Sequence, residues 1–476
     1  MSTNLVGVKL GEKFKRETIM FGKVKKLYFV GIGGAGMSGI AEILHNLGYQ
    51  VSGSDNTPSE VTDYLQNLGI TLFAEHKAAN LSEVDVVVIS SAVGEDNPEV
   101  VEARRRGIPV IKRAEMLGEL MRLKFSIGIA GTHGKTTTTS MIGKILQQGR
   151  YYPTLIVGGV VAELGTGAAL GSGEYLVAEA DEYDKSFLSM FPTVAVVTNL
   201  EADHLDCYDG MDDLIESFLT YMNRVPFYGS VIISADDPNL TKLRPRIARP
   251  YKTFGFDIEA DYRALNIKTE AGRTTFSVYH RGDPLGDVSL KVPGLFNVAN
   301  ALAAIATCYE LDVPFATIAD SLRAFSGVSR RFEVIGEANN ILVIDDYAHH
   351  PSEIKATLTA AKEIGRSRVI VIYQPHLFSR TRDFKTEFAD ALSLADTCVL
   401  TDIYPAREKP IEGITSKIIV EEATKKGIGN FEYVGVKENA IDVVKRIAKP
   451  GDLVITMGAG SVTLIKRKIL EELAKK

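Results

Sequence analysis

The chain has 476 residues, about three times the length of a typical domain, which predicts two or three domains. Hydrophobic residues account for 45% and charged residues for 24% of it, and these ordinary proportions argue against a disordered or fibrous protein. The formal charge of −6, from 54 basic and 60 acidic residues, argues against a nucleic-acid-binding protein, because such proteins usually carry a basic excess.

Cysteine content and the length of apolar runs indicate the cellular compartment of the protein. Cys207, Cys308 and Cys398 are widely spaced and match neither a disulfide framework nor a zinc site, so we expect a reducing, cytoplasmic environment. No apolar run approaches the ~18 residues of a membrane-spanning helix, so we expect no membrane insertion. Residues 1–19 lack an apolar core and predict an N-terminal extension rather than a secretory signal.

Strands and helices alternate over the first block of the chain. Short apolar or β-branched runs predict strands at 27–30, 49–55 and 84–89, and helical spacing predicts helices at 37–47, 60–68 and 115–123. Such alternation is typical of a parallel sheet covered by helices. We expect this block to end near Leu123.

Two further blocks follow, with a boundary expected near Ser329. In the second block the sequence predicts strands at 125–130, 175–178, 194–197 and 231–233, helices at 212–225 and 299–309, and antiparallel hairpins between about 251 and 292. In the third block it predicts strands at 341–344, 369–372, 398–400 and 453–456, with helices between them and an amphipathic helix at 462–473.

Two glycine-rich loops follow predicted strands and open predicted helices. The first contains Gly31, Gly33, Gly34 and Gly36, with Asp55 ending the next strand, a spacing typical of a site for a diphosphate-containing ligand. A tight turn that binds nothing is the alternative. The second contains Gly131, Gly134, Lys135, Thr136 and Thr137, a variant phosphate loop whose lysine would reach nucleotide phosphates and whose threonine would hold magnesium.

Acidic clusters follow two later strands of the second block, at 179–184 and 199–206. Because the carboxyl ends of parallel strands meet at one edge of a sheet, these clusters are expected at the ligand crevice, where carboxylates can hold magnesium. Solvated loop faces are the alternative. His204 lies in the second cluster, and we favour a functional role for it over a packed or solvated histidine.

Basic clusters stand at predicted strand ends of the third block. They are Arg330 with Arg331, the segment 345–351 with His349 and His350, and the segment 374–382 with His376 and Arg380. Paired arginines and histidines suit phosphate and carboxylate groups, although surface salt bridges would also explain each cluster alone. The glycines at 458 and 460 predict no more than a tight turn.

Taken in order, these motifs resemble the Mur ligase family of peptidoglycan synthesis. The segments that carry the resemblance are Gly-Thr-His-Gly-Lys-Thr at 131–136, Glu-Ala-Asp-Glu at 179–182, Asp-His at 203–204, Asn297 with Asn300, Arg-Arg-Phe at 330–332 and Asp-Tyr-Ala-His-His-Pro at 346–351. The resemblance spans the chain from about Met20. It implies three α/β domains: a Rossmann-like domain at 1–123, a P-loop-type ATPase domain at 124–328 and a Rossmann-like domain at 329–476.

The resemblance also implies an activity. The expected enzyme is an ATP-dependent carboxylate–amine ligase that joins L-alanine to UDP-N-acetylmuramate in the cytoplasm through an acyl phosphate, with ATP and Mg²⁺ as cofactors. Its partners would be these small molecules, with no nucleic acid and no membrane, and the protein would be a monomer or homodimer. The alternatives are a recycling ligase that adds a preformed peptide to the same sugar nucleotide, a nicotinamide-dependent oxidoreductase based on the first loop, and a P-loop switch that hydrolyses ATP without forming a bond.

Site residues follow from the resemblance by position. It implies UDP-sugar contacts from Gly31, Gly33, Gly34, Gly36, Asp55, Ser90 and Ser91. It implies ATP contacts from Gly131, Thr132, His133, Gly134, Lys135, Thr136, Thr137, Asn297, Asn300, Arg331 and Asp346. Catalytic roles would fall to Lys135, Glu179, His204, Arg331 and His349, amino-acid binding to Tyr347, His350, His376 and Arg380, and metal binding to Thr136, Glu179 and His204.

Three positions depart from the family pattern. Phe296 stands where a histidine is frequent, and Leu377 stands where an arginine is frequent. The predicted helix at 212–225 contains no lysine, so a carbamylated lysine that bridges two metal ions is not expected there.

Overall fold

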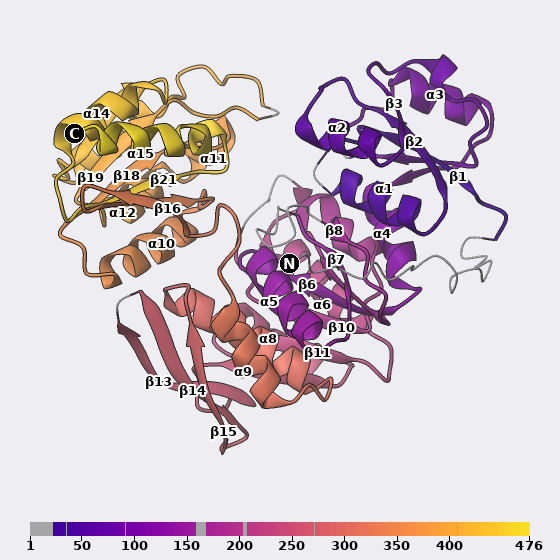
Figure 1. The fold of residues 1–476 in the computed structure, drawn as a ribbon, viewed down its shortest axis with the longest axis horizontal. Helices are drawn as coiled ribbons and strands as arrows, with labels where there is room; N and C mark the ends of the chain where they lie inside the picture. Colours follow the sequence, from indigo (N-terminus) through magenta and orange to yellow (C-terminus); the bar gives the residue numbers. More distant parts are fainter. Residues whose placement is uncertain are drawn as a thin grey trace, which may run out of the picture. The chain divides into compact units, whose positions relative to one another are not determined.

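A computed structural model describes residues 22–34, 36–90, 92–158, 168–202, 207–270, 272–406 and 408–476. The chain divides into two compact units, Met1–Leu123 and Lys124–Lys476, which are taken separately below (Figure 1). The predicted extension at 1–19 and the candidates Ser91 and His204 lie outside the described residues. Within the described ranges, no helix is long and apolar enough to cross a membrane. Cys207, Cys308 and Cys398 form no disulfide.

The first unit is a five-stranded sheet in the order β3-β2-β1-β4-β5, and every pair of neighbours is parallel. Its elements are β1 Lys26–Val30, α1 Met37–Asn46, β2 Gln50–Ser54, α2 Glu60–Asn67, β3 Thr71–Phe73, η1 Ala78–Asn80, β4 Val86–Ile89, α3 Pro98–Arg105, β5 Val110–Lys112 and α4 Arg113–Met121. The parallel sheet expected from the alternating pattern is confirmed, and the short strands β3 and β5 were not predicted.

The second unit begins with a ten-stranded sheet in the order β15-β14-β13-β12-β11-β10-β6-β9-β7-β8. Its elements are β6 Phe125–Ala130, α5 Lys135–Gln148, β7 Thr154–Ile156, β8 Ala168–Ala169, β9 Tyr175–Glu179, η2 Tyr183–Ser189, β10 Val194–Val197, α6 Met211–Asn223, β11 Ser230–Ser234, α7 Pro238–Leu243, η4 Arg244–Arg246, β12 Tyr251–Gly255, β13 Tyr262–Glu270, β14 Arg273–His280, β15 Asp283–Leu290, α8 Leu295–Tyr309 and α9 Phe315–Ala324. Strands β9 and β10 both pair in parallel with β6, so their carboxyl ends flank the loop that follows β6.

Two predictions in this region need correction. The hairpin prediction for 251–292 holds for β13, β14 and β15, but β12 pairs in parallel with both neighbours, and α7 lies in the crossover that joins β11 to β12. Helix α8 starts at Leu295 rather than at 299, directly after Gly294. Asn297 and Asn300 therefore lie in the first turns of this helix. Helices α5, α8 and α9 contribute to one apolar core against the sheet.

The second unit ends with a six-stranded sheet in the order β16-β17-β21-β18-β19-β20, in which β16 alone runs antiparallel to its neighbour. The elements are β16 Glu333–Ala338, β17 Ile341–Asp346, α10 Pro351–Glu363, β18 Val369–Tyr373, α11 Phe378–Asp383, α12 Lys385–Leu392, β19 Thr397–Thr401, α13 Lys417–Lys425, β20 Phe431–Gly435, α14 Asn439–Ile447, β21 Leu453–Met457, η5 Ser461–Ile465 and α15 Lys466–Ala474. Strands β16 and β20 were not predicted.

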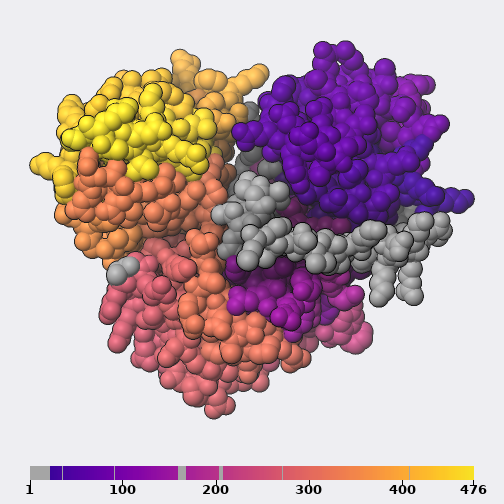
Figure 2. All heavy atoms as spheres, viewed as in Figure 1, coloured from indigo at the N-terminus to yellow at the C-terminus, as the bar shows by residue number. Residues whose placement is uncertain are grey.

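Apolar side chains cover both faces of this last sheet. Helices α10, α12 and α13 pack on one face, and α14, η5 and α15 pack on the other. In the space-filling view the C-terminal part of the chain, coloured light orange to yellow, forms one body (Figure 2). The three sheets confirm the three-part α/β fold class that the sequence predicts.

Candidate active site

The loop after β6 has the backbone of a phosphate-binding turn. Gly131 has φ 133° and Gly134 has φ 84°, both in the left-handed region that favours glycine. A Cβ at Gly131 would lie 2.0 Å from Oγ1 of Thr198, and one at Gly134 would lie 2.3 Å from Oδ1 of Asn300. Helix α5 begins at Lys135, so the backbone N–H groups of its first turn adjoin the loop, where anions bind favourably.

Lys135 folds back onto its own loop and onto the acidic cluster. Its Nζ donates to Oε2 of Glu182 at 2.7 Å and to the carbonyl of Gly131 at 2.7 Å. Burial alone would lower the pKa of Lys135, but the attraction of Glu182 and Asp181 raises it above the ordinary value, so the side chain is a cation. A positive charge therefore stands at the loop and is balanced by carboxylates.

Glu179 ends β9 beside this loop. Thr136 and the backbone N–H of Gly158 hydrogen-bond to its carboxylate, and burial raises its pKa. Its Oε1 is buried and has no hydrogen-bond partner among the described residues. A buried carboxylate oxygen beside a threonine hydroxyl is a donor set suited to Mg²⁺. His204, predicted to complete the metal site, lies outside the described residues.

The side chain of His133 points from the loop toward α10. Its Nδ1 lies 3.1 Å from Oε1 of Glu353, and its Nε2 lies 2.9 Å from Oγ of Ser352 and 3.4 Å from Oε2 of Glu201. Burial lowers the pKa of His133, but the two carboxylates outweigh burial and raise it to about 9. Donor atoms of His133, Glu201 and His350 also lie within 4.8 Å of one another, a second group that could hold a metal ion.

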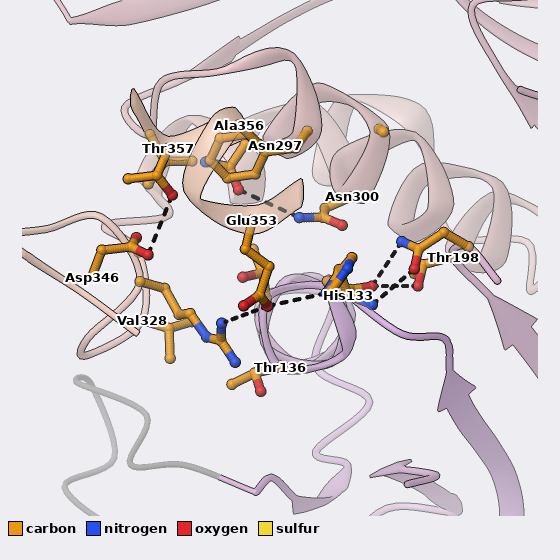
Figure 3. A pocket seen from close by; sticks show the side chains of 18 of the residues that line it. His133, Thr136, Thr198, Asn297, Asn300, Val328, Asp346, Glu353, Ala356 and Thr357 are labelled. Atoms are coloured by element: carbon orange, nitrogen blue, oxygen red, sulfur yellow. Dashed lines mark hydrogen bonds and ion pairs between the residues drawn. The ribbon is translucent and has the colours of Figure 1, made fainter. Parts of the chain in front are cut away.

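A cavity of about 230 Å³ opens beside the loop (Figure 3). Among its lining residues are eight that the resemblance assigns to ATP, from distant segments of the chain: His133, Gly134, Thr136, Thr137, Asn297, Asn300, Arg331 and Asp346. Apolar walls come from Phe254, Val292, Phe325 and Val328, and Phe296 also lines the cavity. The structure thus brings these residues from separate segments of the chain together at one cavity.

Polar groups around the cavity are held by neighbouring atoms. The carboxylate of Asp346 accepts from the N–H groups of Phe332 at 2.7 Å and Ala348 at 2.8 Å, and burial raises its pKa to about 6. Asn297 donates to the carbonyl of Pro293 at 2.7 Å, and Asn300 accepts from Thr138 at 3.3 Å. These bonds fix the orientation of the side chains that line the cavity.

Tyr347 organises the paired arginines. The guanidinium carbons of Arg330 and Arg331 lie 4.6 Å and 4.8 Å from the centre of its ring. Arg330 also donates to the carbonyls of Gly458 at 2.7 Å and Gly460 at 3.2 Å, so the predicted turn after β21 anchors this arginine. Arg331 is the member of the pair that lines the cavity, with Nη1 3.7 Å from Oε1 of Glu353.

The predicted amino-acid cluster divides into two groups. The ring of His349 lies 5.3 Å from that of Tyr347 and 5.7 Å from that of His376, which stacks on Tyr404. His350 instead caps α10, and its ring lies 5.5 Å from that of His133. The adjacent residues His349 and His350 therefore contact different groups: His349 lies beside Tyr347 and His376, and His350 lies beside His133.

Helix α11 carries the remaining member of that cluster, Arg380, which is buried. Glu408 caps the helix by accepting from the N–H groups of Phe378 at 2.6 Å and Ser379 at 3.0 Å. Leu377, which stands in place of a frequent arginine, is buried at the start of α11 with φ 70°.

The glycine loop of the first unit is closed by a carboxylate. The N–H of Gly33 donates to Oδ2 of Asp55 at 2.8 Å, and a Cβ at Gly36 would lie 3.1 Å from Nη1 of Arg113. Ser90 lies beside Gly31, and its neighbour Ser91 is outside the described residues. Arg113, at the start of α4, therefore adds a cation to the candidate UDP-sugar site.

Sequence reasoning missed Arg113, Glu353 and Glu408. Glu353 had a detectable signal, because it is the third residue of a helix that follows a histidine cap and a proline, a position where glutamate caps a helix. Arg113 and Glu408 had no such signal in the sequence, because Arg113 lies beside a loop, and Glu408 caps a helix, that is distant from it in the chain.

Comparisons with known proteins agree with this architecture of three α/β sheets. The family model of the Mur ligase catalytic domain matches residues 26–125, that of the Mur ligase middle domain matches 129–308, and that of the Mur ligase glutamate ligase domain matches 330–460. The chain therefore belongs to the Mur ligase family.

Individual members of the family are similar to the chain over nearly its whole length. UDP-N-acetylmuramate–L-alanine ligase of Geobacter sulfurreducens is 52% identical over 93% of this chain and 96% of its own length, and that of Geobacter sp. (strain M21) is 49% identical over 95% and 98%. The crystal structure of UDP-N-acetylmuramate-alanine ligase from Thermotoga maritima matches with a TM-score of 0.80 at 31% identity, covering 94% of this chain and 99% of that one. A murein peptide ligase from Psychrobacter arcticus matches with a TM-score of 0.69 at 27% identity, over 94% and 99%.

Proposed function

We propose that the protein is an ATP-dependent ligase that joins L-alanine to the carboxylate of UDP-N-acetylmuramate, releasing ADP and phosphate. The observation that carries the proposal is the cavity in which the phosphate loop, with its cationic Lys135, meets Arg331 and Asp346 from the last domain. Relatives about 50% identical over nearly the whole chain that bear this activity in their names support the choice of substrates.

Each domain has a task in this proposal. Residues 1–123 bind the UDP-sugar at the Gly31–Gly36 loop with Asp55, Ser90 and Ser91, residues 124–328 bind ATP, and residues 329–476 hold the amino acid. In the ATP site, Gly131, Thr132, His133, Gly134, Thr136 and Thr137 surround the phosphates, while Asn297 and Asn300 face the adenine and Asp346 faces the ribose. The hydrogen bonds that hold Asn297 and Asp346 in place support these orientations.

The first chemical step transfers a phosphoryl group. A carboxylate oxygen of the sugar nucleotide forms a bond to the γ-phosphorus, the bond from that phosphorus to the β,γ-bridging oxygen breaks, and ADP leaves. Charge spreads over the transferred group, and preorganised cations stabilise such charge most effectively. Lys135 and Arg331 are the cations for this task, which requires Lys135 to exchange Glu182 for phosphate.

The second step forms the amide. The amino nitrogen of L-alanine attacks the acyl carbonyl carbon, the carbon–oxygen bond to phosphate breaks, and the nitrogen gives up a proton. His349 is suited to take that proton: its Nδ1 lies 3.2 Å from Oε2 of Glu353 and 3.1 Å from the carbonyl of Tyr347. Two acceptors at Nδ1 place the ring hydrogen there, so Nε2 is the nitrogen that can accept a proton. Tyr347, His350, His376 and Arg380 are proposed to surround the amino acid.

Magnesium fits the residues that the sequence named for it. Thr136 and Glu179 would hold the ion, because the buried Oε1 of Glu179 has no partner among the described residues and stands beside the threonine. When bound, Mg²⁺ would neutralise charge on the nucleotide phosphates. His204 is proposed to hold a second ion. We further propose a cytoplasmic monomer or homodimer that acts without nucleic acid.

A product assay with an amino-acid panel tests the proposal. With saturating ATP and UDP-N-acetylmuramate, we expect L-alanine to react fastest, and glycine and L-serine to be roughly 10–200-fold poorer, because a pocket gains only about 1–3 kcal/mol from one methyl group and rejects a hydroxyl weakly. D-glutamate should fail, since Leu377 leaves its second carboxylate without a partner. Faster turnover with a tripeptide than with L-alanine would instead identify the recycling ligase.

A further inference from the structure

We propose that Glu353 is a positioning residue of the ligation reaction: its carboxylate holds the phosphate loop against the turn that carries His349, and so sets His133, Arg331 and His349 in one arrangement. This inference rests on the function proposed above. It concerns a residue that contacts four candidate site residues from two different domains, His133, Arg331, His349 and His350.

The two oxygens of Glu353 have separate tasks. Oε2 accepts from the backbone N–H groups of His349 at 2.9 Å and His350 at 3.2 Å, and it also lies 3.2 Å from Nδ1 of His349. This oxygen therefore fixes the turn that precedes α10. A single carboxylate oxygen thereby sets both the backbone and the ring of the candidate proton acceptor.

Oε1 faces the other way, into the cavity. It lies 3.1 Å from Nδ1 of His133 on the phosphate loop and 3.7 Å from Nη1 of Arg331. Ser352 adds a second bond from the same helix to His133, at 2.9 Å. The loop that would surround the phosphates is thus tied to the N-terminus of α10 (Figure 3).

The surroundings of Glu353 favour a permanent charge. Its side chain is 11% exposed and is surrounded by His133, His349 and Arg331. A carboxylate that bonds to both domains at once loses this role if either oxygen is changed. Because Glu353 neutralises cations that would attract phosphate, removing its charge is not expected to weaken ATP binding. Its contribution therefore falls on the reaction rather than on affinity.

Glu353→Gln tests this role with little change in shape, because an amide keeps one acceptor oxygen and replaces the other with a donor. We expect kcat for L-alanine ligation to fall roughly 10²-fold, the size of effect produced by misplacing reacting groups by about 1 Å. The dissociation constant of a non-hydrolysable ATP analogue should stay within about threefold of wild type or become tighter. Glu363→Gln, at the exposed last residue of the same helix, is the matched control and should behave as wild type.

Coupling between the two sides is tested separately. If His133 and Glu353 act as one unit, the His133→Gln/Glu353→Gln double variant should be no slower than the slower single variant. Hydrogen exchange should increase in Glu353→Gln at both 131–137 and 347–353, and in neither segment of Glu363→Gln. The inference would be overturned if the losses in kcat of the two single variants multiplied in the double variant. It would also be overturned if hydrogen exchange at 131–137 did not change in Glu353→Gln.

The exchange measurement also separates this inference from the proposed function. If the wild-type chain made no alanine product while exchange changed in both segments, the proposed function would fail and the link between the domains would stand. If the product formed and Glu353→Gln kept wild-type kcat, the positioning role would be wrong.

Discussion

The two glycine-rich loops of this molecule, after β1 and after β6, differ in the side chain that accepts a hydrogen bond from the third residue of the loop. In the first unit the N–H of Gly33 donates to a carboxylate oxygen of Asp55 at 2.8 Å, and in the second the N–H of His133, at the same place in its loop, donates to the amide oxygen of Asn199 at 2.8 Å. A carboxylate adds negative charge beside the first loop, whereas an amide adds none beside the second. The group that closes the second loop therefore adds no negative charge to that of Glu182 and Glu179, which already stand beside this loop.

The two loops also differ in the number of basic residues that they contain. The central loop carries His133 and Lys135 within its own sequence, while the first loop contains no basic residue and is approached by Arg113 from α4. Strand–glycine–helix patterns therefore report a phosphate-binding turn, and the charges around the turn determine which phosphate ligand it suits. Four changes would break or sharpen this comparison.

Lys135→Ala should have the largest effect. Removing one preorganised donor to developing charge typically costs ~10²–10³ in rate, and we expect that loss in kcat with the fold intact. Lys144→Ala, farther along the same helix, is the control. Wild-type turnover in a folded Lys135→Ala protein would contradict the assignment of the phosphate loop.

His133 should make the stability of the central loop depend on pH. An unfolded histidine loses its proton near 6.5, whereas folded His133 retains it to about pH 9. Its stabilisation is therefore complete below pH 6.5 and is lost as pH rises through 9, by about 3 kcal/mol in total at 1.36 kcal/mol per pKa unit.

Denaturant unfolding at pH 6 and pH 9.5 measures this loss of stability. The difference between wild type and His133→Gln isolates the contribution of this residue, and an equal loss in both proteins would show that His133 keeps its ordinary pKa.

Arg113→Ala should weaken the first site alone. A hydrogen bond to a charged group contributes about 1.5–3 kcal/mol, so KM for UDP-N-acetylmuramate should rise about tenfold or more, while KM for ATP stays unchanged. Arg122→Ala, at the other end of α4, serves as the control. A change in KM for ATP rather than for the sugar nucleotide would reverse the assignment of the two loops.

Gly31→Ala should have the smallest effect. A residue other than glycine in the left-handed conformation lowers the free energy of unfolding by about 1–2 kcal/mol. The added Cβ would lie 3.5 Å from Cβ of Ser90, which is an ordinary van der Waals contact. Gly48→Ala, with a similar φ and nothing within 4 Å, should destabilise as much without raising KM for the sugar nucleotide. Equal KM values in the two variants would argue against a ligand at the first loop.

The sequence by itself determined the three α/β sheets and the two glycine-rich turns, because strand alternation and left-handed glycines are properties of short segments. It also named eight of the residues that line the cavity, since residues such as Asn297, Arg331 and Asp346 lie in recognisable motifs. It missed β16 and β20, the two edge strands of the last sheet, in which no residue is buried and the apolar pattern is therefore weak.

Only the tertiary structure decided how the site is held together. His133 and Glu353 are 220 residues apart, Arg113 reaches a loop more than 70 residues earlier, and adjacent His349 and His350 face different partners. Local patterns carry no information on these contacts, because each depends on how separately formed elements pack. The chain determined which chemical groups are present, and packing determined which of them meet.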